Sequence, residues 1–194
     1  MKILVAVPTF ETITPETFKS IYDLDRGEHE VGFEFVKGYD TAKARNKIAK
    51  IAMDGGYDRV LMVDSDMIVP PDTLTRFLEE PVDVISGACP RKNTRKKEAV
   101  LVKFGTEDFW DCYRYDELTE DRMRIKGCGC ACIMISTDVF RGMEYPYFKY
   151  VTYDEGHMLS EDYYFCAKAQ TAGFEIWADT RVRCGHLARY FQYE

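Results

Sequence analysis

Long apolar runs are missing from this sequence. No stretch approaches the roughly 20 residues that a membrane-spanning helix requires, and the first apolar run, Ile3–Val7, is too short for the core of a signal peptide. The seven cysteines are odd in number and lack paired spacing, which argues against a disulfide scaffold. We therefore expect a protein without transmembrane segments in a reducing, cytoplasmic compartment.

An excess of positive charge is missing too. The sequence has 26 Lys and Arg against 33 Asp and Glu, a formal net charge of -7, which argues against a general nucleic-acid or anionic-membrane surface. Internal repeats, low-complexity segments and flexible linkers are also absent. With 194 residues, 46% of them hydrophobic, the chain suits one globular domain over 1–194. Any anionic ligand is therefore expected to bind locally.

Two carboxylates follow a strongly apolar segment. Val60–Val63 predicts a buried strand, and Asp64 and Asp66 come directly after it, where ligands bind in an open α/β sheet. With Ser65 facing the other way, two carboxylates on one side of an extended segment repel each other unless a cation lies between them. Mg²⁺ or Mn²⁺ carrying a diphosphate suits such oxygen ligands. A simpler alternative, in which Asp64 caps a turn and Asp66 is solvated, stays open.

The loop after the first predicted strand is a second candidate for ligand binding. Ile3–Val7 predicts a buried strand, and Pro8, Thr9 and Phe10 follow it. Thr9 could bond a nucleobase and Phe10 could stack on it. A polar turn with one aromatic anchored in the core is the alternative. A helix over 15–24 is expected next.

A strand over 31–36 and a helix over 41–55 come before the acidic strand. Asp40 or Thr41 caps this helix, and its apolar stripe leaves Arg45 and Asn46 to one side. These two side chains are either solvated or border the ligand crevice, because the first turn of the helix lies at the carboxyl edge of the sheet.

The second half of the chain changes character. Pro70, Pro71 and Asp72 open a helix that is expected to run through 79, and a strand over 82–88 follows. After it comes Arg91–Lys97, a run with five positive charges. This run predicts either a solvated loop or a loop that closes over phosphate or an acidic acceptor. Antiparallel strands are expected over 99–124.

Three cysteines alternate with small residues in Gly127–Ile135, which predicts one strand. Side chains at i and i+2 of a straight strand lie about 6 to 7 Å apart, so the cysteines cannot converge on one tetrahedral zinc ion and are expected in the core. The opposite face, with Gly127 and Gly129, is bare and would let a sugar ring approach the backbone.

The last candidates lie near the end of the chain. An aromatic loop over 145–159 contains His157, and Ser160 caps a helix that starts with Glu161 and Asp162. Acidic residues in a first turn are favoured by the helix dipole whatever their function. A short strand over 175–178 precedes His186, which is a candidate ligand.

These motifs in this order resemble the GT-A glycosyltransferases, in particular the family 2-like branch, over nearly the whole chain. The motifs are Val5–Thr9, Ala44–Asn46, Val63–Asp66, Ser160–Asp162 and Cys184–His186. The resemblance implies a single α/β, Rossmann-like domain with a mostly parallel central sheet and a smaller antiparallel part in its second half. It also implies a nucleotide-binding half, 1–90, and an acceptor-side half, 91–194.

The resemblance also implies residue roles. Asp66 would be the principal ligand of Mn²⁺ or Mg²⁺, Asp64 would contact ribose or the metal, and His186 matches a late metal ligand of some members. A metal neutralises the charge that develops on the departing diphosphate, and Asp162 would accept the proton of the acceptor hydroxyl, oriented by Glu161. UDP is favoured, with GDP and dTDP open. A retaining mechanism without this base stays open, as does Asp40 as the base.

Three other functions are compatible with parts of this sequence. A sugar nucleotidyltransferase carries a glycine-rich, arginine-containing loop after its first strand, which Pro8–Thr12 does not resemble. A non-catalytic nucleotide-sugar-binding protein would lack turnover, and an assembly protein would have merely solvated acidic clusters. Because the aromatic loop or a partner subunit would cover the acceptor side, a homo-oligomer also stays open.

Overall fold

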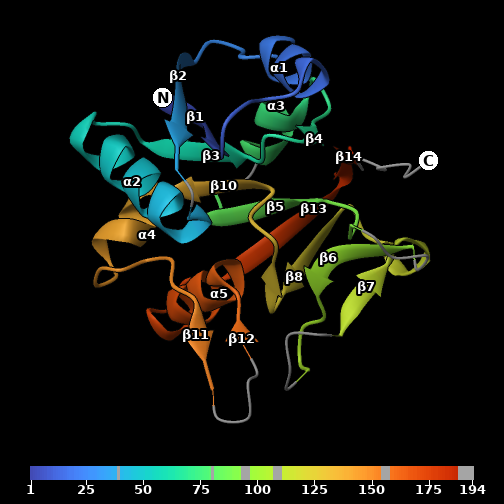
Figure 1. Ribbon diagram of the computed structural model, residues 1–194. Helices are drawn as coiled ribbons and strands as arrows, with labels where there is room; N and C mark the ends of the chain where they lie inside the picture. Colours follow the sequence, from blue (N-terminus) through green and yellow to red (C-terminus); the bar gives the residue numbers. More distant parts are fainter. Residues whose placement is uncertain (39, 80, 93–96, 107–110, 154–157, 188–194) are drawn as a thin grey trace, which may run out of the picture.

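A seven-stranded sheet forms the centre of the computed structural model, which describes residues 1–38, 40–79, 81–92, 97–106, 111–153 and 158–187 (Figure 1). The strand order is β2-β1-β3-β10-β5-β13-β8, and only β10 and β8 run antiparallel to their neighbours. The strands are β1 (Lys2–Thr9), β2 (Glu30–Lys37), β3 (Arg59–Val63), β5 (Val84–Ala88), β8 (Arg122–Ile125), β10 (Cys132–Ser136) and β13 (Ile176–Arg183). The expected mostly parallel sheet is therefore confirmed.

Three smaller antiparallel sheets accompany the central one. Their strands are β6 (Glu98–Val102), β7 (Cys112–Arg114) and β9 (Gly127–Cys128) in the first, β4 (Met67–Ile68) with β14 (Gly185–His186) in the second, and β11 (Val151–Thr152) with β12 (Met158–Leu159) in the third. A 3-10 helix, η1 (Tyr115–Glu117), follows β7. The antiparallel part that was expected over 99–124 is confirmed.

Helices cover both faces of the central sheet (Figure 1). One face packs against α2 (Thr41–Asp54), α4 (Thr137–Arg141) and α5 (Glu161–Thr171) in a large apolar cluster. The other packs against α1 (Pro15–Tyr22) and α3 (Thr73–Phe77). None of the helices within these described ranges has the length and apolarity needed to cross a membrane.

The prediction of one strand over 127–135 is wrong. β9 pairs with β6 in a small sheet, whereas β10 lies between β3 and β5 in the central sheet. The chain must therefore turn between them, and it does so at residues 130 and 131. The cysteines nevertheless lie in the core as expected, because all seven are buried and free.

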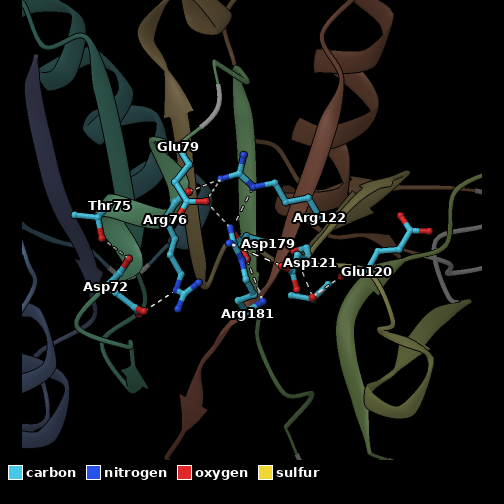
Figure 2. A network of polar contacts seen from close by, with 10 residues as sticks. Asp72, Thr75, Arg76, Glu79, Glu120, Asp121, Arg122, Asp179 and Arg181 are labelled. Atoms are coloured by element: carbon cyan, nitrogen blue, oxygen red, sulfur yellow. Dashed lines mark hydrogen bonds and ion pairs between the residues drawn. The ribbon is translucent and has the colours of Figure 1, made fainter.

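A polar network fixes β13 where it leaves the central sheet (Figure 2). Asp179 is 0% exposed and accepts hydrogen bonds from Arg181 Nε at 2.9 Å and Nη2 at 2.6 Å. Glu79 binds both Arg181 and Arg122. The register of β13 against β5 shifts between Asp179 and Arg183, so the network holds the irregular segment that leads to β14.

Replacing Asp179 with Asn is expected to lower the free energy of unfolding by about 2–4 kcal/mol, because two arginines lose a buried counter-charge. Burial alone would raise the pKa of Asp179, but the hydrogen bonds from Arg181 and Arg122 outweigh it and lower this pKa. The carboxylate therefore stabilises the fold above the ordinary pKa of 3.8 and loses this effect as the pH falls below it.

Urea unfolding at pH 7 and pH 3 measures this difference. The wild type and Asp179→Asn should differ strongly at pH 7 and less at pH 3, whereas the exposed control Asp138→Asn should unfold as the wild type does. Equal stabilities of Asp179→Asn and the wild type at pH 7 would refute the role of the network.

Candidate functional site

The two predicted acidic residues lie in a tight turn at the carboxyl end of β3. The amide of Met67 donates to the carbonyl oxygen of Asp64 at 3.0 Å, and the amide of Asp64 donates to Ala131 at 2.9 Å. The expectation of an extended segment is therefore wrong, because the chain reverses here to form β4. As a consequence, Asp64 and Asp66 contact different cationic partners.

Asp64 is held by a buried arginine. Arg45 is 3% exposed and donates from Nη2 to Asp64 Oδ1 at 2.9 Å and from Nη1 to Glu161. Burial alone would lower the pKa of Arg45, but the charges of Asp64 and Glu161 raise it. Arg45 therefore stays charged and joins the turn after β3 to the first turn of α5.

Glu161 lies in the same buried group. Burial raises the pKa of Glu161, although the charge of Arg45 and a hydrogen bond from the Tyr150 hydroxyl act in the opposite direction. Burial and the neighbouring Glu161 carboxylate in turn raise the pKa of Tyr150 to about 12. Its position in a first turn is favoured by the helix dipole, but the ion pair with Arg45 gives Glu161 a specific tertiary partner. Glu161 therefore joins the first turn of α5 to α2, and its predicted role in catalysis stays a prediction.

Asp66 contacts His186 and Lys92. β14 pairs with β4 so that His186 lies opposite Met67, and the amide of Leu187 donates to the carbonyl of Asp66 at 2.9 Å. His186 Nε2 lies 3.4 Å from Asp66 Oδ1, and the Lys92 ammonium contacts Asp66 Oδ2. The hydrogen bonds from His186 and Lys92 lower the pKa of Asp66 to about 2, and Asp66 raises the pKa of His186.

These side chains fit a divalent cation in part. His186 Nδ1 lies 2.9 Å from the carbonyl of Pro90 and can donate to it, which directs the Nε2 lone pair of the neutral ring toward Asp66. Nε2 and a carboxylate oxygen at 3.4 Å then need a proton or a metal between them. Neighbouring ligands of one octahedral ion, each about 2.1 Å from it, lie about 3 Å apart.

The fit is limited to two protein ligands. Among the described residues, no three His, Cys, Asp or Glu side chains form a group that could hold a metal, and the predicted ligand Asp64 is engaged by Arg45. Mg²⁺ and Mn²⁺ sites commonly combine one or two protein ligands with water and substrate phosphates. The pair of Asp66 and His186 suits that kind of site.

A pocket of about 230 Å³ opens beside this turn. Six of the predicted residues line it, namely Pro8, Thr9, Phe10, Asp64, Ser65 and Asp66, together with Gly38, Thr41 and Ala44. The Thr9 hydroxyl donates to the carbonyl of Thr12 at 2.7 Å, which fixes the loop. The structure thus brings the loop after β1 and the acidic turn together around one hollow, and their contacts with a nucleotide stay predictions.

The predicted base lies at the start of α5. Asp162 Oδ1 accepts hydrogen bonds from the Ser160 hydroxyl and from the amide of Tyr163 at 2.8 Å. A Cβ added at Gly129 would lie 3.5 Å from Asp162 Oδ2, so the bare backbone of Gly129 borders this oxygen. Gly127 is instead buried in β9 opposite Val102.

Asn46 and Asp40 have contacts within the protein other than those predicted with a ligand. The Asn46 side chain donates to the carbonyl of Phe148 at 2.7 Å and accepts from the amides of Tyr147 and Phe148, so it anchors the aromatic loop. Asp40 caps α2 by accepting from the amide of Lys43 at 3.0 Å. His157 lies outside the described residues.

Lys92 and Tyr150 are two residues at the site that the motifs did not single out. Lys92 lies in the basic run 91–97, of which residues 93–96 are outside the described part, and this run was the available signal. Tyr150 gives no signal in the sequence, because its partner Glu161 is brought to it only by the fold.

Replacing Arg45 with Met should lower the free energy of unfolding by about 3–5 kcal/mol, because it leaves the Glu161 and Asp64 carboxylates without their buried counter-charge. The double variant Arg45→Met/Glu161→Gln should recover part of the loss. Arg114→Met removes only an exposed ion pair with Asp116 and should unfold at nearly the wild-type urea concentration. Equal midpoints for Arg45→Met and Arg114→Met would contradict this account.

Comparison with known proteins reveals a shared fold at low sequence identity. No protein-family model and no curated protein sequence matches the chain. A197 from STIV aligns with a TM-score of 0.69 and 16% identity over 97% of this chain and 87% of that one. TarS 1-349 of S. aureus, solved in complex with UDP-GlcNAc, aligns with a TM-score of 0.61 and 18% identity over 100% of this chain and 60% of that one.

A third similar structure is a Drosophila β1,4-galactosyltransferase 7 mutant in complex with manganese, UDP-Gal and xylobiose. It aligns with a TM-score of 0.56 and 13% identity over 97% of this chain and 71% of that one. The last two structures are GT-A glycosyltransferases, so this chain has the GT-A fold.

Proposed function

We propose that this chain with the GT-A fold is a metal-dependent glycosyltransferase that moves a sugar from a UDP-sugar to an acceptor hydroxyl. The observation that carries the proposal is the convergence of the pocket beside β1, the pair of Asp66 and His186, and Asp162 at the start of α5. The complexes of similar folds with UDP-GlcNAc and with manganese and UDP-Gal support it.

The donor would occupy the pocket beside the acidic turn. Phe10 is about half exposed and would stack on the base, Thr9 would orient it, and Asp64 would bind the ribose. Asp66 and His186 would hold Mn²⁺ or Mg²⁺ together with the diphosphate. The ion, when bound, supplies Lewis-acid stabilisation of the departing diphosphate.

Asp162 would act as the base of an inverting transfer. Its Oδ1 is occupied by the Ser160 hydroxyl and the amide of Tyr163, while Oδ2 borders the bare backbone of Gly129. Oδ2 would accept the proton of the acceptor hydroxyl while the hydroxyl oxygen attacks the anomeric carbon and the UDP leaves. Glu161, paired with Arg45, would hold the first turn of α5 in position.

Calorimetric titration of UDP and GDP with Mn²⁺, Mg²⁺ or chelator tests the donor site. UDP should bind the wild type only with a metal, and Asp66→Ala should lose this binding. Asp138→Ala, which removes an exposed carboxylate of α4, should retain it. Absence of nucleotide binding under every condition would overturn the assignment and favour an assembly protein.

Asp162→Asn separates binding from turnover. It should bind UDP and Mn²⁺ as the wild type does but lose about 10²–10⁴-fold in transfer or hydrolysis of UDP-sugars, the usual contribution of a general base. Wild-type turnover in Asp162→Asn would exclude this residue as the base. Binding of UDP-sugar without turnover by the wild type would favour the non-catalytic alternative.

Lys92→Gln should strengthen Mn²⁺ binding, because the wild-type ammonium already neutralises Asp66 and must be displaced by the ion. Titration of Mn²⁺ in the presence of UDP measures this change, and Lys19→Gln on α1 serves as a control for the lost charge. Loss of UDP binding in Lys92→Gln, with no effect of metal on the wild type, would instead indicate that Lys92 takes the place of a metal.

A further inference from the structure

A basic and aromatic groove lies on the outer side of α2. Its volume is about 410 Å³, and it is lined by Lys43, Lys47 and Lys50 of the helix and by Tyr145 and Tyr147 of the aromatic loop that follows α4. Spacings of four and three residues place the lysines on one stripe of the helix. The remaining lining residues are Asn46, Met53 and Asp54.

The lysines concentrate positive charge on an acidic protein. Lys43 and Lys50 lie 3.9 Å from Asp40 and Asp54, a separation that gives weak ion pairs at an exposed surface. Within the described part of the chain, Lys47 makes no ion pair. Lys43 and Lys47 also line a neighbouring hollow of about 270 Å³. The stripe therefore offers one ammonium group without an ion pair, Lys47, between two lysines whose ion pairs are weak.

Tyr145 places an exposed aromatic ring on a fixed segment of backbone beside the lysines. Tyr145 is 72% exposed, and its ring lies 5.8 Å from that of Tyr147 at an interplanar angle of 85°. Asn46 binds the backbone of residues 147 and 148, and the Lys168 ammonium binds the carbonyls of Glu144 and Pro146. Tyr147 is buried in the core and supports this ring from its edge. An exposed ring such as that of Tyr145 on a fixed backbone binds a flat apolar face with little loss of conformational entropy.

The groove is close to the proposed donor site. Thr41 and Ala44 of the same helix line the nucleotide pocket, while Lys43 lines the groove. Asn46, which lies in the groove, directly follows Arg45, which binds Asp64 and Glu161. A chain bound along α2 could therefore extend toward the reacting centre.

We propose that this groove binds an acidic oligosaccharide, whose carboxylates pair with the lysine stripe and one of whose sugar rings packs on the exposed ring of Tyr145. This inference rests on the proposed function in one respect, because it assigns the bound sugar chain as the acceptor of that transfer. The lysines are spaced about 6 Å and 4.5 Å apart along the helix axis, a separation of the order of one sugar residue.

Titration of an eight-residue oligogalacturonate without any donor tests the groove. The wild type should bind it, with an affinity that falls as salt is raised, and should not bind uncharged malto-octaose. The triple variant Lys43→Gln/Lys47→Gln/Lys50→Gln should bind about tenfold more weakly, and Tyr145→Ala about threefold more weakly. Lys19→Gln, which removes a lysine of α1, should bind as the wild type does.

Three results would overturn the proposal: no binding of oligogalacturonate, unchanged binding by the triple variant, or tighter binding of an eight-residue oligouridylate. Titration of UDP with Mn²⁺ on the same proteins keeps the two proposals apart. Oligogalacturonate binding without UDP binding would support the proposed groove and contradict the proposed glycosyltransferase function. UDP binding without oligogalacturonate binding would support the donor site and contradict the proposed groove.

Discussion

The buried ion pairs of Arg45 are the interaction on which the arrangement of the site depends. One guanidinium reaches Asp64 after β3 and Glu161 at the start of α5, two segments that lie far apart in the sequence. Removing Arg45 would leave both carboxylates without their buried counter-charge, which is strongly unfavourable. The proposed donor side and the proposed base are therefore held at a fixed separation by one side chain of α2.

Backbone pairing performs the corresponding task on the other side of the acidic turn. The two-residue strands β4 and β14 bring His186 to Asp66, and the network around Asp179 fixes β13 just before β14. Because β14 pairs with β4, His186 in the second half of the chain lies beside Asp66 in the first half.

The apolar periodicity was sufficient to predict the parallel strands and the helices α1, α2, α3 and α5, because burial against the central sheet determines both; the five-residue helix α4 was not predicted. It could not predict the break at residues 130 and 131, since the two halves of that run belong to different sheets. The residues that follow β1 and β3 lie around one pocket because the carboxyl ends of parallel strands meet at one edge of the sheet, and their contacts with a nucleotide stay predictions.

The partners of individual polar residues could not be predicted in the same way. Arg45 and Asn46 lie beside the apolar stripe of α2 and are nevertheless buried, because their partners come from β3, α5 and the aromatic loop. Nothing local in the sequence records such contacts. Lys92 is similar, since its basic run indicates an anionic partner without identifying Asp66.

Diffraction at the manganese absorption edge, from crystals grown with UDP and Mn²⁺, tests the central claim most directly. The account predicts an anomalous difference peak for a manganese ion that is bound by a carboxylate oxygen of Asp66 and by His186 Nε2. Arg45 should still lie between Asp64 and Glu161. A UDP-bound structure with no manganese at these residues, or with Arg45 withdrawn from either carboxylate, would contradict it.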